Sequence, residues 1–171
     1  MLFRSSALKN AFSQCDLVVT SGGVSVGEFD FLKQAFNDLG GDLQFWKVAI
    51  KPGRPFVFGK WGEKLLFGLP GNPVSAAVTF LLLVRPALLR WQGAAETSLR
   101  VQPGLLAETL LNPDKRRHFV RVRIDSEGKV TSAGTQASHM LGSLARANGL
   151  LDVPPQTTLS VGTPVRVFRW E

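Results

Sequence analysis

A glycine-rich loop between an apolar strand and a helix constrains the fold of this chain more than any other feature. The β-branched run at residues 16–20 predicts a buried strand, and residues 31–39 predict a helix. The loop between them, residues 20–30, has the sequence TSGGVSVGEFD. Its glycines let the backbone approach a ligand, and the following helix directs free N–H groups toward an anion. The motif therefore predicts an α/β domain that binds a phosphate or an oxyanion.

The loop carries several candidate ligand-binding residues, for which a structural alternative exists. We predict that Ser21, Gly22, Gly23 and Ser25 contact the ligand. Alternatively, the glycines only make a tight turn, and Asp30 is only the N-cap of the following helix. A carboxylate beside a phosphate site is also a usual ligand of Mg²⁺, so Asp30 is both our candidate metal ligand and a candidate catalytic residue. Capping and metal binding stay open for Asp30, whereas for the whole loop we favour ligand binding.

A strand that delivers two lysines to a rigid turn is the second candidate site. Residues 46–55 have the sequence WKVAIKPGRP, in which an apolar strand ends at two prolines. Positions 47 and 51 differ by an even number, so on one strand both side chains point to the same face. Two ammonium groups on one face repel each other unless an anion lies between them. We therefore predict that Lys47 and Lys51 are catalytic, and the alternative is a solvated edge with scattered lysines.

The segment GLPGNPVS, at residues 68–75, is a rigid turn that opens an apolar helix. It places Asn72 and Ser75 near the positive end of that helix, so it is a further candidate anion site. Capping by Asn72 and a first helical position for Pro73 explain most of the motif without any function. The stretch that follows, residues 74–89, is nearly all apolar and is expected to be largely buried.

The pattern of elements predicts two domains. Residues 1–93 alternate helices and strands, which is typical of an α/β domain, and they begin with a packed helix because Leu8, Ala11 and Phe12 recur at helical spacing. Residues 99–171 contain five short strands punctuated by Gly, Pro and Asn, which predicts a small, all-β, barrel-like domain. Besides residues 16–20, the expected strands cover residues 43–50, 56–61, 64–68, 105–111, 118–124, 129–133, 149–153 and 164–170, with a helical turn within residues 138–147.

One strand of the second domain carries a basic face. Alternation places Arg117, Phe119, Arg121 and Arg123 on the same side of it. The turn GTQASH, at residues 134–139, adds hydroxyls and an imidazole that could reach a ligand, although such a histidine is more often a plain surface residue. Most surface arginines only keep a protein soluble, so this face alone does not establish a site.

Composition limits the classes of partner. Lys and Arg number 20 against 13 Asp and Glu, and the formal net charge of +7 favours anionic partners. A nucleic-acid groove would need more aromatic residues among the cations, so we predict no nucleic-acid partner. No apolar run approaches the roughly 20 residues that span a bilayer, so we predict a soluble, cytoplasmic protein with no membrane partner. The single cysteine, Cys15, excludes an intrachain disulfide, and the usual zinc-binding patterns are absent.

Read together and in this order, the motifs resemble the molybdopterin molybdenumtransferase family, to which gephyrin's E domain belongs. They are SGGVS with Gly27 and Asp30, then KPGRP at residues 51–55, then GLPGNPVS. The resemblance continues through FVR at residues 119–121 and GTQASH at residues 134–139, so it covers nearly all of the chain. It implies the carboxy-terminal half of a three-layer, molybdopterin-binding α/β domain, followed by the family's β-rich carboxy-terminal domain.

The resemblance also implies a reaction in which adenylyl-molybdopterin and molybdate, with Mg²⁺, yield molybdenum cofactor and AMP. Every reactant is anionic, which agrees with the glycine loop, the lysines and the basic strand. Carried over by motif, Asp30 would supply acidic site chemistry. The residues that would hold molybdate or the pterin phosphate are Ser25, Lys47, Lys51, Pro52, Ser75, Arg121 and Ser138, with Pro70, Asn72 and Pro73 in the same turn motif.

Members of this family are longer, with further amino-terminal domains and an earlier half of the α/β domain. In the family, the site lies between subunits of a homodimer and takes acidic residues from the portion that this sequence lacks. We therefore expect activity to require a homodimer or an amino-terminal portion supplied in trans. Two alternatives remain: a non-catalytic module or scaffold that binds a pterin or an oxyanion, and a nucleic-acid binder whose affinity falls steeply with salt.

Overall fold

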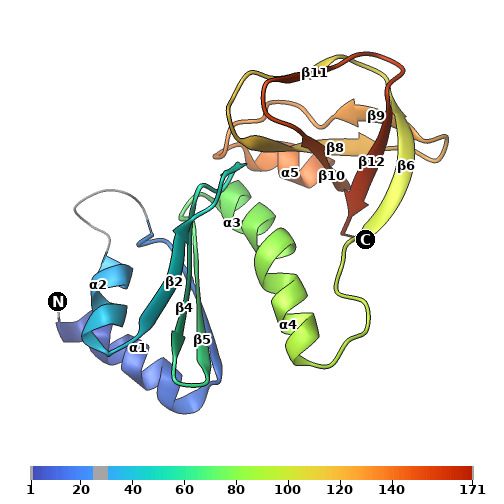
Figure 1. The fold of residues 1–171 in the computed structure, drawn as a ribbon. Coiled ribbons are helices and arrows are strands. Elements are labelled where there is room, and N and C mark those ends of the chain that lie inside the picture. The colour runs from blue at the N-terminus through green and yellow to red at the C-terminus, as the bar shows by residue number, and fades with distance from the viewer. Residues whose placement is uncertain (1, 25–30, 171) are drawn as a thin grey trace. The chain divides into compact units, whose positions relative to one another are not determined.

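The computed structural model describes residues 2–24 and 31–170, which form two compact units (Figure 1). The first unit comprises the described residues up to Val48 together with Gly53–Thr79. The second comprises Ala49–Pro52 together with the described residues from Phe80 onward. The predicted fold class, an α/β domain with a small barrel-like β domain, is confirmed, whereas a domain boundary between residues 93 and 99 stays a prediction.

The first unit is a four-stranded sheet with helices packed against it. Its elements are α1 (Leu2–Gln14), β1 (Leu17–Ser21), α2 (Phe31–Asp38), β2 (Asp42–Lys47), β4 (Pro55–Trp61), β5 (Lys64–Leu69) and α3 (Pro73–Thr79). The strand order is β1-β5-β4-β2, in which β1 and β5 are parallel and the other neighbours are antiparallel. Leu8 and Phe12 of α1 lie in the core, as predicted for a packed first helix, and Phe36 of α2 joins them.

Strand β1 lies at one edge of this sheet. Among the described strands it pairs only with β5. Val18 faces the core, but Val19 is 41% exposed. The predicted strand is confirmed, whereas the prediction that it is buried is wrong for Val19 and Ser21, which are exposed; Val18 is buried, and Leu17 and Thr20 are half-buried. A β-branched run favours an extended backbone, but burial depends on the neighbours that the tertiary fold supplies.

The strand predicted to carry both lysines is interrupted. β2 ends at Lys47, and the Val48 amide donates to the carbonyl of Arg54 (3.0 Å). The chain then bends, and Ile50–Lys51 forms the short strand β3, which pairs in parallel with a strand of the second unit. The prediction that Lys47 and Lys51 share a face of one strand is therefore wrong, because even spacing fixes a common face only along an uninterrupted strand.

One long apolar helix follows β5. It consists of α3 (Pro73–Thr79), a π-helical stretch, η1 (Phe80–Val84), and α4 (Arg85–Trp91). The π-helical stretch comes just before Pro86, whose ring and missing N–H disturb α-helical bonding. Only 28% of its most apolar window is buried, so the prediction that residues 74–89 are largely buried is wrong. By length and composition this helix could also cross a membrane, although core helices of soluble proteins share both properties.

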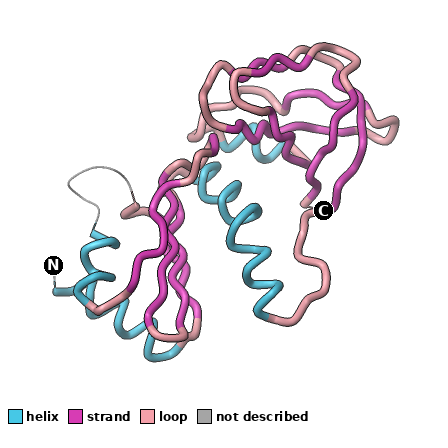
Figure 2. Tube along the Cα trace, viewed as in Figure 1, coloured by secondary structure: helices cyan, strands magenta, loops and turns pink. Residues whose placement is uncertain are grey.

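The second unit contains a closed β-barrel, whose strands are joined mainly by loops (Figure 2). Besides β3, η1 and α4, its elements are β6 (Arg100–Leu106), β7 (Leu110–Asn112), β8 (Arg117–Ile124), β9 (Lys129–Ser132), α5 (Leu141–Arg146), β10 (Gly149–Val153), β11 (Thr157–Leu159) and β12 (Pro164–Arg169). The order is β10-β12-β6-β9-β8-β3, and pairing of β10 with β8 closes the first five into a ring. β7 and β11 pair separately.

The strand predicted at residues 105–111 is wrong in its position. β6 ends at Leu106 and β7 begins only at Leu110, while the first part of β6 was not predicted. Pro103 and Gly104 obscured it, because these residue types usually mark turns. In the barrel Gly104 is a close-approach position, since a Cβ there would lie 2.6 Å from the carbonyl oxygen of Gly128.

Candidate functional site

Two of the predicted ligand loops meet at the end of the first unit's sheet where β1 and β5 terminate. β1 and β5 run in parallel and in register up to Ser21 and Leu69, so their carboxyl ends lie side by side. The Gly22 amide donates to the carbonyl of Leu69 (2.9 Å), and the Ser21 hydroxyl lies 3.5 Å from the carbonyl oxygen of Pro70. The loop after β1 and the turn after β5 therefore form one surface, where α/β sheets commonly bind ligands.

The glycines of this surface have the conformations that the motif predicts. φ is +83° at Gly22 and +71° at Gly23, in the left-handed region that glycine adopts without strain. A Cβ on Gly71 would lie only 3.6 Å from the Cα of Gly22. The two loops thus approach each other without intervening side chains, and exposed backbone at Gly23 and Gly71 is accessible to a ligand.

The turn after β5 supports the capping alternative for one of its residues. The carbonyl of Asn72 accepts a hydrogen bond from the Ala76 amide (2.9 Å), as expected of an N-cap residue. Asn72 and Pro73 are exposed, whereas Pro70 is buried and Ser75 is only 4% exposed. Within this turn, Gly71, Asn72 and Pro73 are therefore the residues that present surface to a ligand.

A largely apolar hollow of about 580 Å³ adjoins the glycine loop. Its walls are α1, β1, the start of α2 and the residues Ser21, Gly22 and Gly23. The described residues that line it include no lysine, arginine, aspartate or glutamate. The part of the hollow along α1 and β1 offers no neutralising charge and suits an apolar polypeptide segment, whereas Ser21, Gly22 and Gly23 at its end offer polar backbone and a hydroxyl.

The cations predicted to be catalytic lie in different units. Lys47 ends β2 in the first unit, where its Nζ lies 4.4 Å from the centre of the Trp46 ring. The Nζ of Lys33, on α2, lies 4.1 Å from the same ring, so positive charge gathers at this end of β2. Lys51 lies in β3 of the second unit, and the buried Pro52 follows it. The catalytic role of both lysines stays a prediction.

The predicted basic face of β8 is only partly a surface. Its residues alternate as expected, and those of the opposite face fill the barrel core. Arg123 is exposed, and Arg117 pairs with Asp152 of β10 (Nε–Oδ1 3.1 Å). Arg121, in contrast, has no exposed surface. Burial lowers the pKa of Arg121 from its ordinary value.

His118 is a buried titratable residue that the sequence interpretation missed. It lies on the core-facing side of β8 and is 5% exposed. Burial, followed by the positive charges of Lys51 and Arg121, lowers the pKa of His118 from 6.5 to about 4. His118 is therefore neutral near pH 7. Its even-numbered spacing from Val120 and Val122 was the sequence signal for an inward position.

We expect acid to destabilise the second unit through His118. In the unfolded chain it takes up a proton near pH 6.5, but in the folded protein only near pH 4. The unfolded state therefore binds more protons in between, so the stability contributed by neutral His118 is complete above pH 6.5 and lost as the pH falls toward 4. The expected loss is on the order of 1–3 kcal/mol.

The free energy of unfolding in urea, compared at about pH 7 and about pH 5, measures this loss. It changes with pH according to the difference in bound protons between the unfolded and the folded state. Replacing His118 with glutamine should make stability less dependent on pH in this window. The matched control is His139→Gln, which removes an exposed histidine and should leave the dependence unchanged. Equal pH dependence in the unsubstituted protein and His118→Gln would contradict the assignment.

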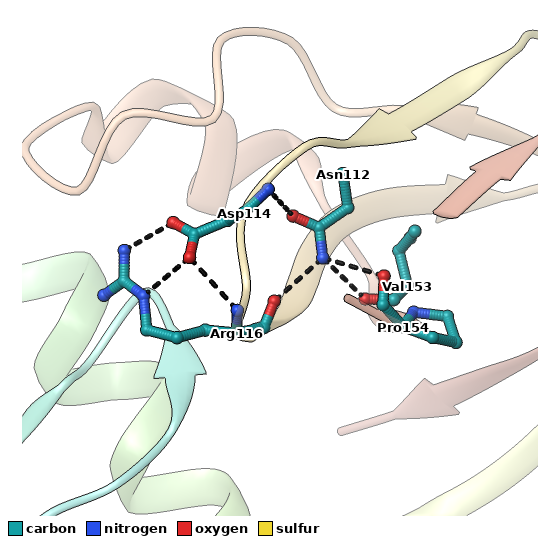
Figure 3. A network of polar contacts seen from close by, with 5 residues as sticks. All are labelled: Asn112, Asp114, Arg116, Val153 and Pro154. Carbon is teal, nitrogen blue, oxygen red and sulfur yellow. Dashed lines mark hydrogen bonds and ion pairs between the residues drawn. The ribbon is translucent and has the colours of Figure 1, made fainter. Parts of the chain in front are cut away.

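A polar cluster around Asn112 was also missed (Figure 3). The Asn112 side chain has no exposed surface, and its amide donates to the carbonyls of Arg116 (2.9 Å), Val153 (3.1 Å) and Pro154 (2.9 Å). Asp114 accepts two hydrogen bonds from the Arg116 guanidinium (3.0 and 2.6 Å), which hold the pKa of Asp114 well below its usual range. In sequence, Asn-Pro-Asp signals only a turn, whereas here it ties the end of β7 to the end of β10.

Some predicted site residues lie outside the described part of the chain. These are Ser25, Gly27 and Asp30, so their roles stay predictions. Ser138 is half-buried in the turn before α5, and its role in ligand binding also stays a prediction. Within residues 2–24 and 31–170, no group of three or more His, Cys, Asp or Glu side chains could hold a metal ion.

Two protein-family models match successive parts of the chain. Residues 4–90 match the family described as "Probable molybdopterin binding domain". Residues 103–170 match the family described as "MoeA C-terminal region (domain IV)". The first match contains the glycine loop and the turn after β5, and the second contains Arg121 and Ser138.

Individual proteins agree with these matches. Molybdopterin molybdenumtransferase of Haemophilus influenzae is 43% identical over 145 residues, which cover 81% of this chain and 35% of that protein. Molybdopterin molybdenumtransferase 2 of Mycobacterium tuberculosis is 40% identical over 160 residues, which cover 90% of this chain and 40% of that protein. The crystal structure of a molybdopterin biosynthesis MoeA protein from Pyrococcus horikoshii superposes with a TM-score of 0.81 and 28% identity, covering 98% of this chain and 40% of that one. The chain thus spans less than half the length of these relatives.

Proposed function

Because the chain belongs to the molybdopterin molybdenumtransferase family, we propose that it carries part of the site that inserts molybdate into adenylyl-molybdopterin. The products of this reaction are molybdenum cofactor and AMP. The observation that carries the proposal is the surface at the carboxyl ends of β1 and β5, where Gly22 and Gly71 come together. The full activity is proposed for a longer assembly, because the chain spans 35% and 40% of two relatives.

The chemistry of this surface suits an anionic substrate. Positive φ at Gly22 and Gly23 lets the loop backbone approach an anion closely, and the Ser21 hydroxyl lies beside it, while the Gly22 amide is already bonded to the Leu69 carbonyl. We place the pterin phosphate here. Molybdate and phosphate repel each other, so fixed cations are needed to hold both, and Lys47 and Lys51 stay the proposed catalytic cations, each in its own unit.

We include Mg²⁺ in the proposal because Asp30 is the predicted metal ligand and because the family resemblance implies the ion. The described residues offer no carboxylate cluster for the ion, so it has no assigned step in the proposed reaction. We also place the reaction in the cytoplasm, where reducing conditions suit the exposed thiol of Cys15.

We further propose that the amino-terminal portion found in longer family members docks on the open edge of β1. This portion would belong to a longer chain, be supplied in trans, or come from a homodimer partner. Val19 exposes an apolar side chain on this edge, and the apolar hollow of about 580 Å³ adjoins it. An exposed apolar strand edge tends to associate unless another segment covers it. The surface that the substrate would use continues directly from this edge at Ser21 and Gly22.

The test is AMP release from adenylyl-molybdopterin with molybdate and Mg²⁺. We expect the chain alone to release little AMP, and addition of the amino-terminal part of the Haemophilus influenzae relative to restore release and to reconstitute a cofactor-free molybdoenzyme. Release by the chain alone would show that it is a sufficient enzyme. No release in either case, with the substrate still bound, would favour a non-catalytic binding module instead.

Val19→Lys tests the docking edge in the same experiment. A charge on the edge of β1 should weaken association with the amino-terminal part by about tenfold or more, because it would have to be buried there. The matched control is Val161→Lys, which replaces a valine that is 63% exposed in the second unit and should leave association unchanged. If both variants associate as well as the unsubstituted chain, the edge is not the docking surface.

A further inference from the structure

Arg121 is a buried cation that no acidic residue neutralises among the described residues. It lies at the centre of β8, on the side that faces away from the barrel core, and has no exposed surface. Residues 133–143 cover it. This segment contains the turn with Ser138 and His139 and the start of α5.

The guanidinium of Arg121 uses its donors on this covering segment. Its Nε donates to the hydroxyl of Ser143 (2.8 Å), which in turn donates to the carbonyl of Met140 (2.7 Å). Its Nη2 donates to the carbonyls of Thr135 (3.1 Å) and Ala137 (3.2 Å). One side chain therefore fixes the backbone on both sides of Ser138.

The main chain of Arg121 adds to this fixation. Its amide donates to the side-chain oxygen of Gln136 (2.9 Å), and its carbonyl accepts from the side-chain nitrogen of Gln136 (3.1 Å) and from the amide of Ala133 (3.0 Å). Recognition of a phosphate by arginine frequently uses two donors in one plane. Here Nε and Nη2 already donate to the covering segment and only Nη1 lacks a partner among the described residues, so Arg121 offers no free bidentate edge.

We propose that Arg121 is a positioning residue, which sets the conformation of the turn at residues 134–140 so that Ser138 can meet the substrate. This role, which rests on the proposed function, differs from the direct contact that the family resemblance implies. Because the guanidinium keeps its charge and lies directly beneath the turn, it also favours an anion there without touching it. Binding of an anion at the turn should therefore depend on Arg121 in two ways, through the conformation of the turn and through the positive electrostatic potential of the guanidinium.

Hydrogen exchange of the chain without ligand tests the positioning role independently of activity. In Arg121→Met, the hydrogen-bonded amides of Ala133, Gly134 and Met140 in the segment should lose protection by at least about tenfold, while amides of β10 and β12 in the barrel change little. The matched control is Arg123→Met, which removes an exposed cation from the same face of the same strand and should leave the turn protected. Unchanged protection of the turn in Arg121→Met would overturn the proposal.

A milder variant keeps the test available if Arg121→Met does not fold. Ser143→Ala removes one partner of the guanidinium and leaves Arg121 in place, so the turn should lose protection in the same residues. A Ser143→Ala chain with a fully protected turn would contradict the proposal.

The link to Ser138 is tested by AMP release from the complete assembly. Arg121→Lys and Ser138→Ala should each raise KM by about tenfold, since small displacements of a positioned group are costly. If Arg121 acts through Ser138, the double variant should be no worse than the single ones. Multiplied effects in the double variant, with normal exchange of the turn in Arg121→Lys, would instead make Arg121 a direct ligand.

Discussion

Replacing Phe36 with alanine is expected to lower the free energy of unfolding of the first unit by about 4 kcal/mol, because it empties a fully buried ring site. Phe36 has no exposed surface, and its ring centre lies 6.0 Å from that of Phe12. The ring also fills the space above two glycines, since a Cβ would lie 2.6 Å from it at Gly41 and 2.5 Å from it at Gly59. On the side of these two glycines there are therefore no side chains that could move in to fill the cavity.

Urea unfolding followed by tryptophan fluorescence measures this loss for Phe36→Ala. The matched control is Phe45→Ala, which removes a ring that is 46% exposed and should cost about 1 kcal/mol or less. Phe36→Leu should fall between the two, because it retains most of the apolar contacts. A loss below about 1 kcal/mol in Phe36→Ala would mean that the first unit repacks around the missing ring. Since α2 follows the glycine loop, we also expect this variant to impair substrate binding.

The second large effect is expected from Asn112→Ala, which should destabilise the second unit by about 3 kcal/mol. The variant leaves the carbonyls of Arg116, Val153 and Pro154 without the amide that they share, and the Asp114 amide without its acceptor (Figure 3). Buried carbonyls without partners are costly, whereas an exposed asparagine contributes little.

Asp114→Asn is the control for this prediction. It weakens the ion pair with Arg116 but leaves every hydrogen bond of the Asn112 side chain to the three carbonyls in place. We expect a clearly smaller loss, because this ion pair is partly exposed to solvent. Thermal unfolding of both variants gives the comparison. A loss in Asp114→Asn as large as in Asn112→Ala would show that the ion pair, and not the buried amide, fixes this segment.

Local structure was largely predictable from the sequence. The strand, the glycine loop and the helix after it were expected in that order, and Gly22 and Gly23 have the positive φ that such a loop requires. The first helix is packed through Leu8 and Phe12, as their spacing predicts. In the second unit, the closed barrel and the alternation along β8 were also expected. These features depend on the geometry of residues close together in the chain, which periodicity reports directly.

The candidate site was predictable only in part. The sequence contains every motif of it, but the meeting of the Ser21–Gly23 loop with the turn at residues 70–72 follows from the parallel register of β1 and β5. Register is a property of two strands and depends on contacts across the sheet. The motif match therefore indicated the chemistry, and the pairing of strands decided which residues share a surface.

The sequence by itself predicted most of the elements and their order, and it led to the expectation of an anionic ligand. Only the tertiary structure decided that Lys47 and Lys51 belong to different units, that β1 is an edge strand, and that Arg121 is enclosed by a turn. Spacing along a chain predicts which side chains can share a face of a strand, but it does not predict where the strand bends or which segment covers that face. Those outcomes depend on contacts between residues far apart in sequence, and therefore on the whole fold.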